Sequence, residues 1–227
     1  MRATALALLA AAILAAPALA QESLYGPQPP RDSAWLRVVN ALPAEASVQA
    51  DSKPPQVLGT ARQQRVGSYT VVEAVENRAV KLTARAAGRS ATLDLPLKPG
   101  TYTTALLSAG ADGAPVLRAW TDTSEFNQLR ARLSFYNAVP GCPGAALTME
   151  GGGAIMKDVA PNTAAMRSVN PVATTLQAGC PGGTSAPVAL EGLEAGGLYS
   201  VWLMPEGQGV TAFLARDTIT AWQRPAR

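Results

Sequence analysis

The stretch LRVVNALP at residues 36–43 returns as LSFYNAVP at residues 133–140, 97 positions later. In the first copy, Leu36, Val38 and Asn40 fall on one face of an extended chain, and the second copy repeats this alternation. A period of two that is closed by a proline is typical of a half-buried β-strand. The two stretches therefore predict the same strand at the start of two similar units.

The spacing of 97 residues recurs along the rest of the chain. Matches at one fixed spacing over most of each half indicate an internal duplication. The 20 glycines and 18 prolines among 227 residues also favour turns over long helices. We therefore predict an all-β fold of two tandem β-sandwich domains of similar topology. The matched pairs are Leu93 with Leu190, Gly100 with Gly197, Tyr102 with Tyr199, Leu106 with Leu203, and Leu117 with Leu214.

The first residues are typical of a secretory signal peptide. Arg2 precedes an apolar, alanine-rich run, and Ala18-Leu19-Ala20 provides a small-residue cleavage site. No later stretch is long and apolar enough to span a bilayer. We expect cleavage before Gln21 and a mature chain that is exported to the periplasm.

The composition of the remaining chain predicts the domain boundaries. The polar stretch TDTSEFNQLRAR begins at residue 121, where the first set of strands ends, and is the expected linker. The predicted organisation is a signal peptide at 1–20, a proline-rich lead at 21–33, a first β-sandwich at 34–120, a linker at 121–130 and a second β-sandwich at 131–227.

A tyrosine follows a turn at corresponding places in the two halves. The stretch LKPGTY ends one strand, turns at Gly100 and begins the next strand at Tyr102, while LEAGGLY does the same before Tyr199. In Greek-key sandwiches, a tyrosine at such a corner can hydrogen-bond back to the backbone. We predict this structural role for both tyrosines.

Cys142 and Cys180 are the only cysteines of the chain. An even number of cysteines in an exported protein predicts a disulfide, and both precede a proline at the end of a predicted strand. A metal site would need more ligands than the sequence offers nearby. We therefore predict that the two cysteines are bonded to each other.

The sequence lacks the residues that most hydrolases and acyltransferases use. The chain has no histidine, which excludes Ser-His-Asp and Cys-His pairs and histidine-based metal sites. No Ser-x-x-Lys pattern or phosphate-binding loop is present. We predict no catalytic, cofactor-binding or metal-binding residues.

The charge balance gives no support for a polyanionic partner. With 19 basic and 16 acidic residues the net charge is +3, and loss of Arg2 leaves 18 − 16 = +2. So small an excess is a weak footprint for nucleic acid, and we predict no nucleic-acid partner.

The mature start and several strand residues resemble a known family. Leu24-Tyr25-Gly26-Pro27, followed by Ser33-Ala34 and a strand with Arg37 and Asn40, is similar to the mature start of the AlgF family of periplasmic alginate O-acetylation accessory proteins. The stretch VNPV at 169–172 resembles the strand entry in the second half of that family. The cysteine pair and the glycine-rich loops depart from the family pattern.

The resemblance implies a non-catalytic periplasmic adaptor with two β-sandwich domains. Such a protein works beside a membrane-bound O-acyltransferase and a periplasmic acetyltransferase that decorate an exopolysaccharide, alginate or a related polymer. The apolar lead Leu24, Tyr25, Gly26 and Pro27 either docks on its own domain or contacts one of these partners.

Two other functions remain open at the level of sequence. A carbohydrate-binding module would need several exposed aromatic residues on one face, and alternation turns only Trp202 away from the face of Tyr199 and Leu203. An acyl-transfer enzyme would need a base, and the absence of histidine disfavours it.

Overall fold

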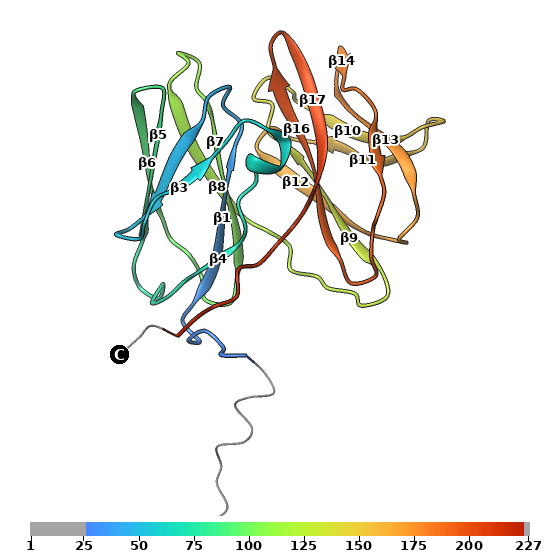
Figure 1. The fold of residues 1–227 in the computed structure, drawn as a ribbon. Coiled ribbons are helices and arrows are strands. Elements are labelled where there is room, and N and C mark those ends of the chain that lie inside the picture. Colours follow the sequence, from blue (N-terminus) through green and yellow to red (C-terminus); the bar gives the residue numbers. More distant parts are fainter. Residues whose placement is uncertain (1–25, 225–227) are drawn as a thin grey trace, which may run out of the picture. The chain divides into compact units, whose positions relative to one another are not determined.

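The computed structural model describes residues 26–224, and within this range every regular element except one short 3₁₀ turn is a β-strand. Figure 1 draws the strands in sequence order from blue to red. The all-β prediction is confirmed. The predicted signal peptide, Leu24 and Tyr25 lie outside the described residues.

Two four-stranded sheets form the first sandwich-like unit. One sheet has the order β4-β1-β7-β8, with β1 and β7 parallel, and the other has the order β3-β2-β5-β6. Apolar side chains from the facing sides of the two sheets form the first core. The elements are β1 (Ala34–Asn40), β2 (Ala46–Ala50), β3 (Gln56–Leu58), η1 (Arg62–Gln64), β4 (Thr70–Val72), β5 (Val80–Ala86), β6 (Arg89–Leu95), β7 (Tyr102–Ala109) and β8 (Pro115–Thr121).

The second sandwich-like unit repeats this arrangement. One sheet has the order β12-β9-β16-β17, and the other has the order β11-β10-β13-β14, with β15 also paired to β13. A second apolar core lies between them. The strands are β9 (Ala131–Asn137), β10 (Ala145–Met149), β11 (Ala154–Val159), β12 (Thr163–Val169), β13 (Thr174–Cys180), β14 (Gly183–Thr184), β15 (Val188–Leu190), β16 (Leu198–Glu206) and β17 (Gly209–Arg216).

The two opening strands end with the same hydrogen-bonded asparagine. The Asn40 side chain accepts a bond from the Leu42 N–H and donates to the carbonyl of Leu58. The Asn137 side chain accepts from the Val139 N–H and donates to the carbonyl of Val159. The spacing of 97 residues between β1 and β9 is therefore a structural equivalence, and two tandem units of similar topology are confirmed.

The spacing changes to 96 residues at β7 and β16. Leu36 lies opposite Thr103 in β7, whereas its equivalent Leu133 lies opposite Tyr199 in β16. Thr103, and not Tyr102, is therefore the counterpart of Tyr199, and the predicted pairing of the two tyrosines is wrong by one residue. The second half is one residue shorter here, because 67 positions separate Leu36 from Thr103 and 66 separate Leu133 from Tyr199.

The glycines of the two turns show the same shift. Gly100 has a φ of 75° and Gly196 a φ of 76°, the left-handed region that favours glycine. Gly196 is therefore the counterpart of Gly100, and the predicted match with Gly197 is also wrong by one residue.

The register shift gives the two tyrosines different roles. The hydroxyl of Tyr199 accepts from the Glu194 N–H at 3.0 Å and donates to the Gly192 carbonyl, as a corner tyrosine does. Tyr102 stacks on Trp35 instead, with 4.9 Å between ring centroids. The predicted corner role is confirmed for Tyr199 and wrong for Tyr102.

A third apolar cluster contains residues of both sandwiches. The strands β1, β7, β9 and β16 are buried on both faces, because the faces turned away from the first and second cores meet in this cluster. All strands accordingly belong to one compact unit, Pro30–Ala221. The buried members of the cluster are Val39, Ala41, Leu106, Tyr136, Ala138, Trp202, Met204, Phe213 and Ala215.

Over residues 26–224, none of the helical structure is long and apolar enough to cross a membrane.

Candidate functional site

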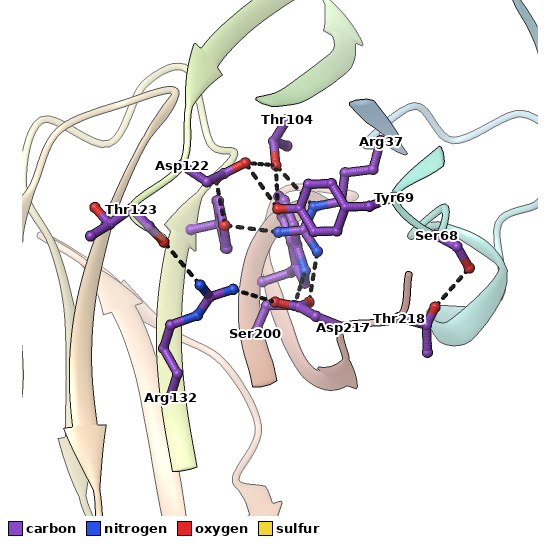
Figure 2. A network of polar contacts seen from close by, with 12 residues as sticks. Arg37, Ser68, Tyr69, Thr104, Asp122, Thr123, Arg132, Ser200, Asp217 and Thr218 are labelled. Atoms are coloured by element: carbon purple, nitrogen blue, oxygen red, sulfur yellow. Dashed lines mark hydrogen bonds and ion pairs between the residues drawn. The ribbon is translucent and has the colours of Figure 1, made fainter. Parts of the chain in front are cut away.

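A buried arginine lies beside the third cluster and bonds to both halves of the chain. Arg37 projects from β1, and only 1% of its surface is exposed. Its Nε donates to Thr104 Oγ1 at 2.9 Å within the first sandwich. Its Nη1 donates to Asp217 Oδ1 at 2.6 Å and its Nη2 to the Tyr136 hydroxyl at 2.8 Å, both in the second half. Figure 2 shows the guanidinium at the centre of this network.

The carboxylate of Asp122 accepts hydrogen bonds from three hydroxyl groups of the network. Asp122 immediately follows β8, and its N–H donates to the carbonyl of Tyr102. Tyr69 and Thr104 donate to its Oδ2 at 2.9 and 2.6 Å. Tyr136 donates to its Oδ1 at 2.7 Å. A carboxylate at the end of the first sandwich is therefore bound by a tyrosine of the second.

Asp217 occupies the equivalent place after β17. Its N–H donates to the carbonyl of Leu198, which is the counterpart of Tyr102. Its Oδ1 accepts from the Ser200 hydroxyl at 2.7 Å, and this hydroxyl accepts from Trp202 Nε1 at 2.8 Å. The duplicated fold has thus produced two similar hydroxyl–carboxylate pairs, with Arg37 between them.

Aromatic rings enclose the guanidinium. The Arg37 Cζ lies 4.4 Å from the ring centroid of Tyr69, a cation–π contact. Tyr136 stacks on Trp202 with 4.0 Å between centroids and an interplanar angle of 9°. These rings exclude water, and in a low dielectric the hydrogen bonds of the network are strengthened.

The electrostatics of the network fix its protonation state. Burial by itself lowers the pKa of Arg37, but the carboxylate of Asp217 and the neighbouring groups outweigh burial and raise the pKa above its usual value. Burial raises the pKa of Tyr69 and of Tyr136 above the usual range, although Arg37 acts in the opposite direction. At neutral pH the network therefore holds a charged arginine and neutral phenols that donate hydrogen bonds.

A second arginine extends the network towards the linker. Arg132 Nη2 lies 3.9 Å from Asp217 Oδ2, and its Nη1 donates to the Thr123 carbonyl at 2.9 Å. Two arginines thus accompany the carboxylates of Asp122 and Asp217, which balances the buried charge.

The segment after β17 lies against the first sandwich. The N–H of Tyr69 donates to the Thr218 carbonyl, and the N–H of Thr220 donates to the Tyr69 carbonyl. The hydroxyls of Ser68 and Thr218 form a hydrogen bond of 2.7 Å, and Figure 2 draws this contact. This strap, residues 217–220, ties the end of the second sandwich to the edge of the first.

The chemistry of the network is structural. Acyl transfer needs a nucleophile that reaches substrate and a base beside it. The hydroxyls of Thr104 and Ser200 are buried, and both are already bonded to carboxylates. Within residues 26–224, no group of three or more His, Cys, Asp or Glu side chains could hold a metal ion.

The residues singled out in the sequence lie away from this network. Cys142 and Cys180 form a disulfide with 5.4 Å between Cα atoms, as predicted, and it ties the turn between β9 and β10 to the end of β13. Gly26 and Pro27 are exposed. Trp202 does turn away from the second core, but it is fully buried, so it offers no platform to a sugar.

The network cannot be recognised in the sequence. Its members are far apart in the chain and match no known motif. One signal was present: Asp-Thr follows the last strand of each half, at Asp122-Thr123 and Asp217-Thr218. A repeated acidic residue at the end of a duplicated strand indicates a shared structural role, but it does not reveal that Arg37 is the partner.

The fold and the network define an all-β protein whose two duplicated sandwiches are joined by a common apolar cluster and a buried ion-pair network. The chain belongs to the AlgF family: the family model described as alginate O-acetyl transferase AlgF matches residues 5–197. This family is involved in alginate O-acetylation. Family membership and the disulfide indicate a protein that works outside the cytoplasm.

Other comparisons add little. No curated protein matches the chain. Among solved structures, a protein of Bacteroides fragilis assigned to cell adhesion matches with a TM-score of 0.24 and 10% identity, over 82% of this chain and 86% of that one. A likeness of this size carries no conclusion about function.

Proposed function

We propose that the chain is a non-catalytic periplasmic adaptor that links the membrane-bound O-acyltransferase and the periplasmic acetyltransferase of an exopolysaccharide O-acetylation system. The family description names an acetyl transferase, so the proposal concerns which protein of the system carries out the transfer. Partner proteins carry out acetyl transfer, and this chain holds them together.

The observation that supports this proposal most is the use made of the polar side chains. Arg37, Tyr69, Tyr136 and Asp217 are buried and bonded within the network. Asp122 is half-buried, and its two oxygens are occupied by three hydroxyl donors. The result is a rigid joint between two sandwiches, which suits a scaffold that presents sheet faces and edges in a fixed relation.

The apolar lead Leu24, Tyr25, Gly26 and Pro27 is our candidate for part of the partner contact. A proline-containing segment is stiff and is ordered at low entropic cost when it binds. Replacement of Leu24 and Tyr25 by alanine should then weaken capture of the partners without affecting the cores.

The test combines an activity assay with a capture assay. Purified mature protein should neither hydrolyse an acetyl ester nor transfer acetyl groups to polymer, and it should co-purify with the two acetylation proteins. Ester turnover above that of a heat-inactivated sample would overturn the adaptor proposal in favour of an enzyme. Saturable binding of alginate oligomers without capture of either protein would favour a carbohydrate-binding module.

A further inference from the structure

The two sandwiches differ at one equivalent edge. β4 and β12 both lie at the outer end of the sheet that contains the opening strand. β4 is only three residues long, and its Val71 carbonyl accepts a bond from Lys53 Nζ at 2.6 Å. β12 is seven residues long and pairs with β9 alone. In the described chain, the edge is therefore closed in the first half and open in the second.

An open edge strand offers a row of hydrogen-bonding groups. Alternate N–H and C=O groups of an antiparallel strand point away from its partner and are available to another strand. The pairing of β12 with β9 is in register over all seven residues, from Thr163 to Val169, and contains no bulge or proline. β12 is thus a regular template for a further strand.

A groove runs between β12 and the neighbouring edge strand β11. The larger apolar residues that line it are Ile155, Met156 and Met166. Its two charged side chains, Lys157 and Arg167, are both cationic and exposed. A ligand that fills the groove should therefore combine apolar side chains with negative charge.

The position of Arg167 strengthens the preference for a negatively charged ligand. Arg167 lies opposite Leu133, which is in the second core, so it belongs to the row of β12 that faces the interior of the sandwich. An inward-facing charge on an edge strand opposes pairing with a wholly apolar strand. An incoming strand with a carboxylate beside Arg167 removes that penalty and gains an ion pair.

β11 is a poorer template than β12. Its pairing with β10 contains register shifts, and Asp158 has a φ of 55°. Such irregularities bend a strand and interrupt its free edge. The groove therefore has one regular edge, which is β12.

We propose that the free edge of β12, with Lys157 and Arg167, binds an extended, acid-containing peptide segment of a partner protein by β-strand addition. The backbone edge and the methionine-lined groove favour a peptide over an acidic polysaccharide, which would gain little from unpaired N–H and C=O groups. The biological use of this surface rests on the adaptor function proposed above, but the binding itself can be tested separately.

The test uses isotope-labelled mature protein and two synthetic peptides of about eight residues. Both alternate valine and threonine, and they differ only in a central glutamate or lysine. The glutamate peptide should cause saturable shifts of the backbone amides of residues 163–169, and the lysine peptide should bind roughly tenfold more weakly. Arg167→Glu should reverse this preference.

Arg85→Glu is the matched control, because Arg85 is exposed on β5 of the first sandwich. It should leave both affinities unchanged. The proposal is overturned if the glutamate peptide leaves the β12 amides unshifted, or if Arg167→Glu and Arg85→Glu behave alike. It is also overturned if alginate oligomers, and not the peptides, shift residues 154–167. Peptide binding without capture of acetylation proteins would instead count against the adaptor and leave this surface in place.

Discussion

Arg37 Nη1 donates to Asp217 Oδ1 at 2.6 Å, although the two residues are 180 positions apart. Both side chains are buried, at 0% and 1% exposure, and each belongs to a different sandwich. A buried ion pair adds little net stability relative to a well-packed apolar pair, but loss of one partner leaves an uncompensated charge. The contact therefore specifies how the two halves join more than it raises the free energy of unfolding.

Arg37→Met should destabilise the protein strongly. It leaves Asp217 buried without its main partner and removes donors to Tyr136 and Thr104. We expect a loss of about 3–5 kcal/mol in the free energy of unfolding, measured by denaturant titration.

The control is Arg216→Ala, which breaks an exposed ion pair with Glu194. That change should leave the denaturation midpoint almost unchanged, since exposed pairs contribute little. Equal losses for the two variants would mean that the network is not the joint described above.

High pH should unfold the protein through its buried tyrosines. Burial raises the pKa of Tyr69 and Tyr136 in the folded state above the ordinary value of about 10. A raised folded-state pKa contributes stability that is fully present below the unfolded-state pKa and is lost as the pH rises above it. Stability should therefore fall steeply above about pH 10.

The measurement is phenolate absorbance followed together with circular dichroism. The absorbance of Tyr69 and Tyr136 should rise only as the fold is lost. Tyr69→Phe keeps the ring but removes one hydroxyl, so it should reduce the amplitude of this late phase. Full ionisation of all tyrosines while the β-sheet signal persists would contradict the prediction.

The sequence predicted the repeated architecture well, because duplication leaves signals that do not depend on tertiary contacts. The matched asparagines Asn40 and Asn137 end equivalent strands, and period-two alternation marks the strands around them. The register of β16 could not be predicted, because the loss of one residue between β9 and Tyr199 is invisible without the partner strand.

The candidate site was less predictable for a different physical reason. A buried ion-pair network is defined by proximity in space, and the period-two alternation around Arg37 predicts a strand with one exposed face. The first core covers one face of β1, and only the third apolar cluster, on the other face, removes the environment of Arg37 from water. The boundaries predicted for the two domains likewise stay a prediction, because they concern how the halves fold.

The turn glycines test the one-residue shift directly. Gly100→Ala and Gly196→Ala should each cost about 1 kcal/mol, since alanine is strained at a φ near 75°. Gly141→Ala is the control, because its added Cβ meets nothing within 4 Å and its φ is not in the left-handed region. Thermal unfolding midpoints would show the difference. A neutral Gly196→Ala would remove the equivalence of Gly196 with Gly100.

The Cys142–Cys180 bond should stabilise the second sandwich. The two cysteines are separated by 38 positions, so closing that loop contributes roughly 4 kcal/mol in the chain-entropy model. Unfolded, unreduced protein should show no free thiol on labelling. A variant with both cysteines changed to alanine should lose most of the stabilisation, and reductant should then have no further effect on it.

The two sandwiches should unfold as one cooperative unit. Trp202 and Tyr136 of the second half pack with Val39 and Leu106 of the first in the third cluster, so unfolding of one half would expose this surface of the other. Leu147→Ala makes a cavity in the second core alone, at a cost of about 2–5 kcal/mol. The free energy of opening measured by hydrogen exchange should fall by this same amount for the slowest-exchanging amides of both halves. Leu82→Ala in the first core should likewise lower the protection of both halves. Loss of protection confined to the mutated half would mean that 34–120 and 131–227 fold independently, and that the network links two separate domains.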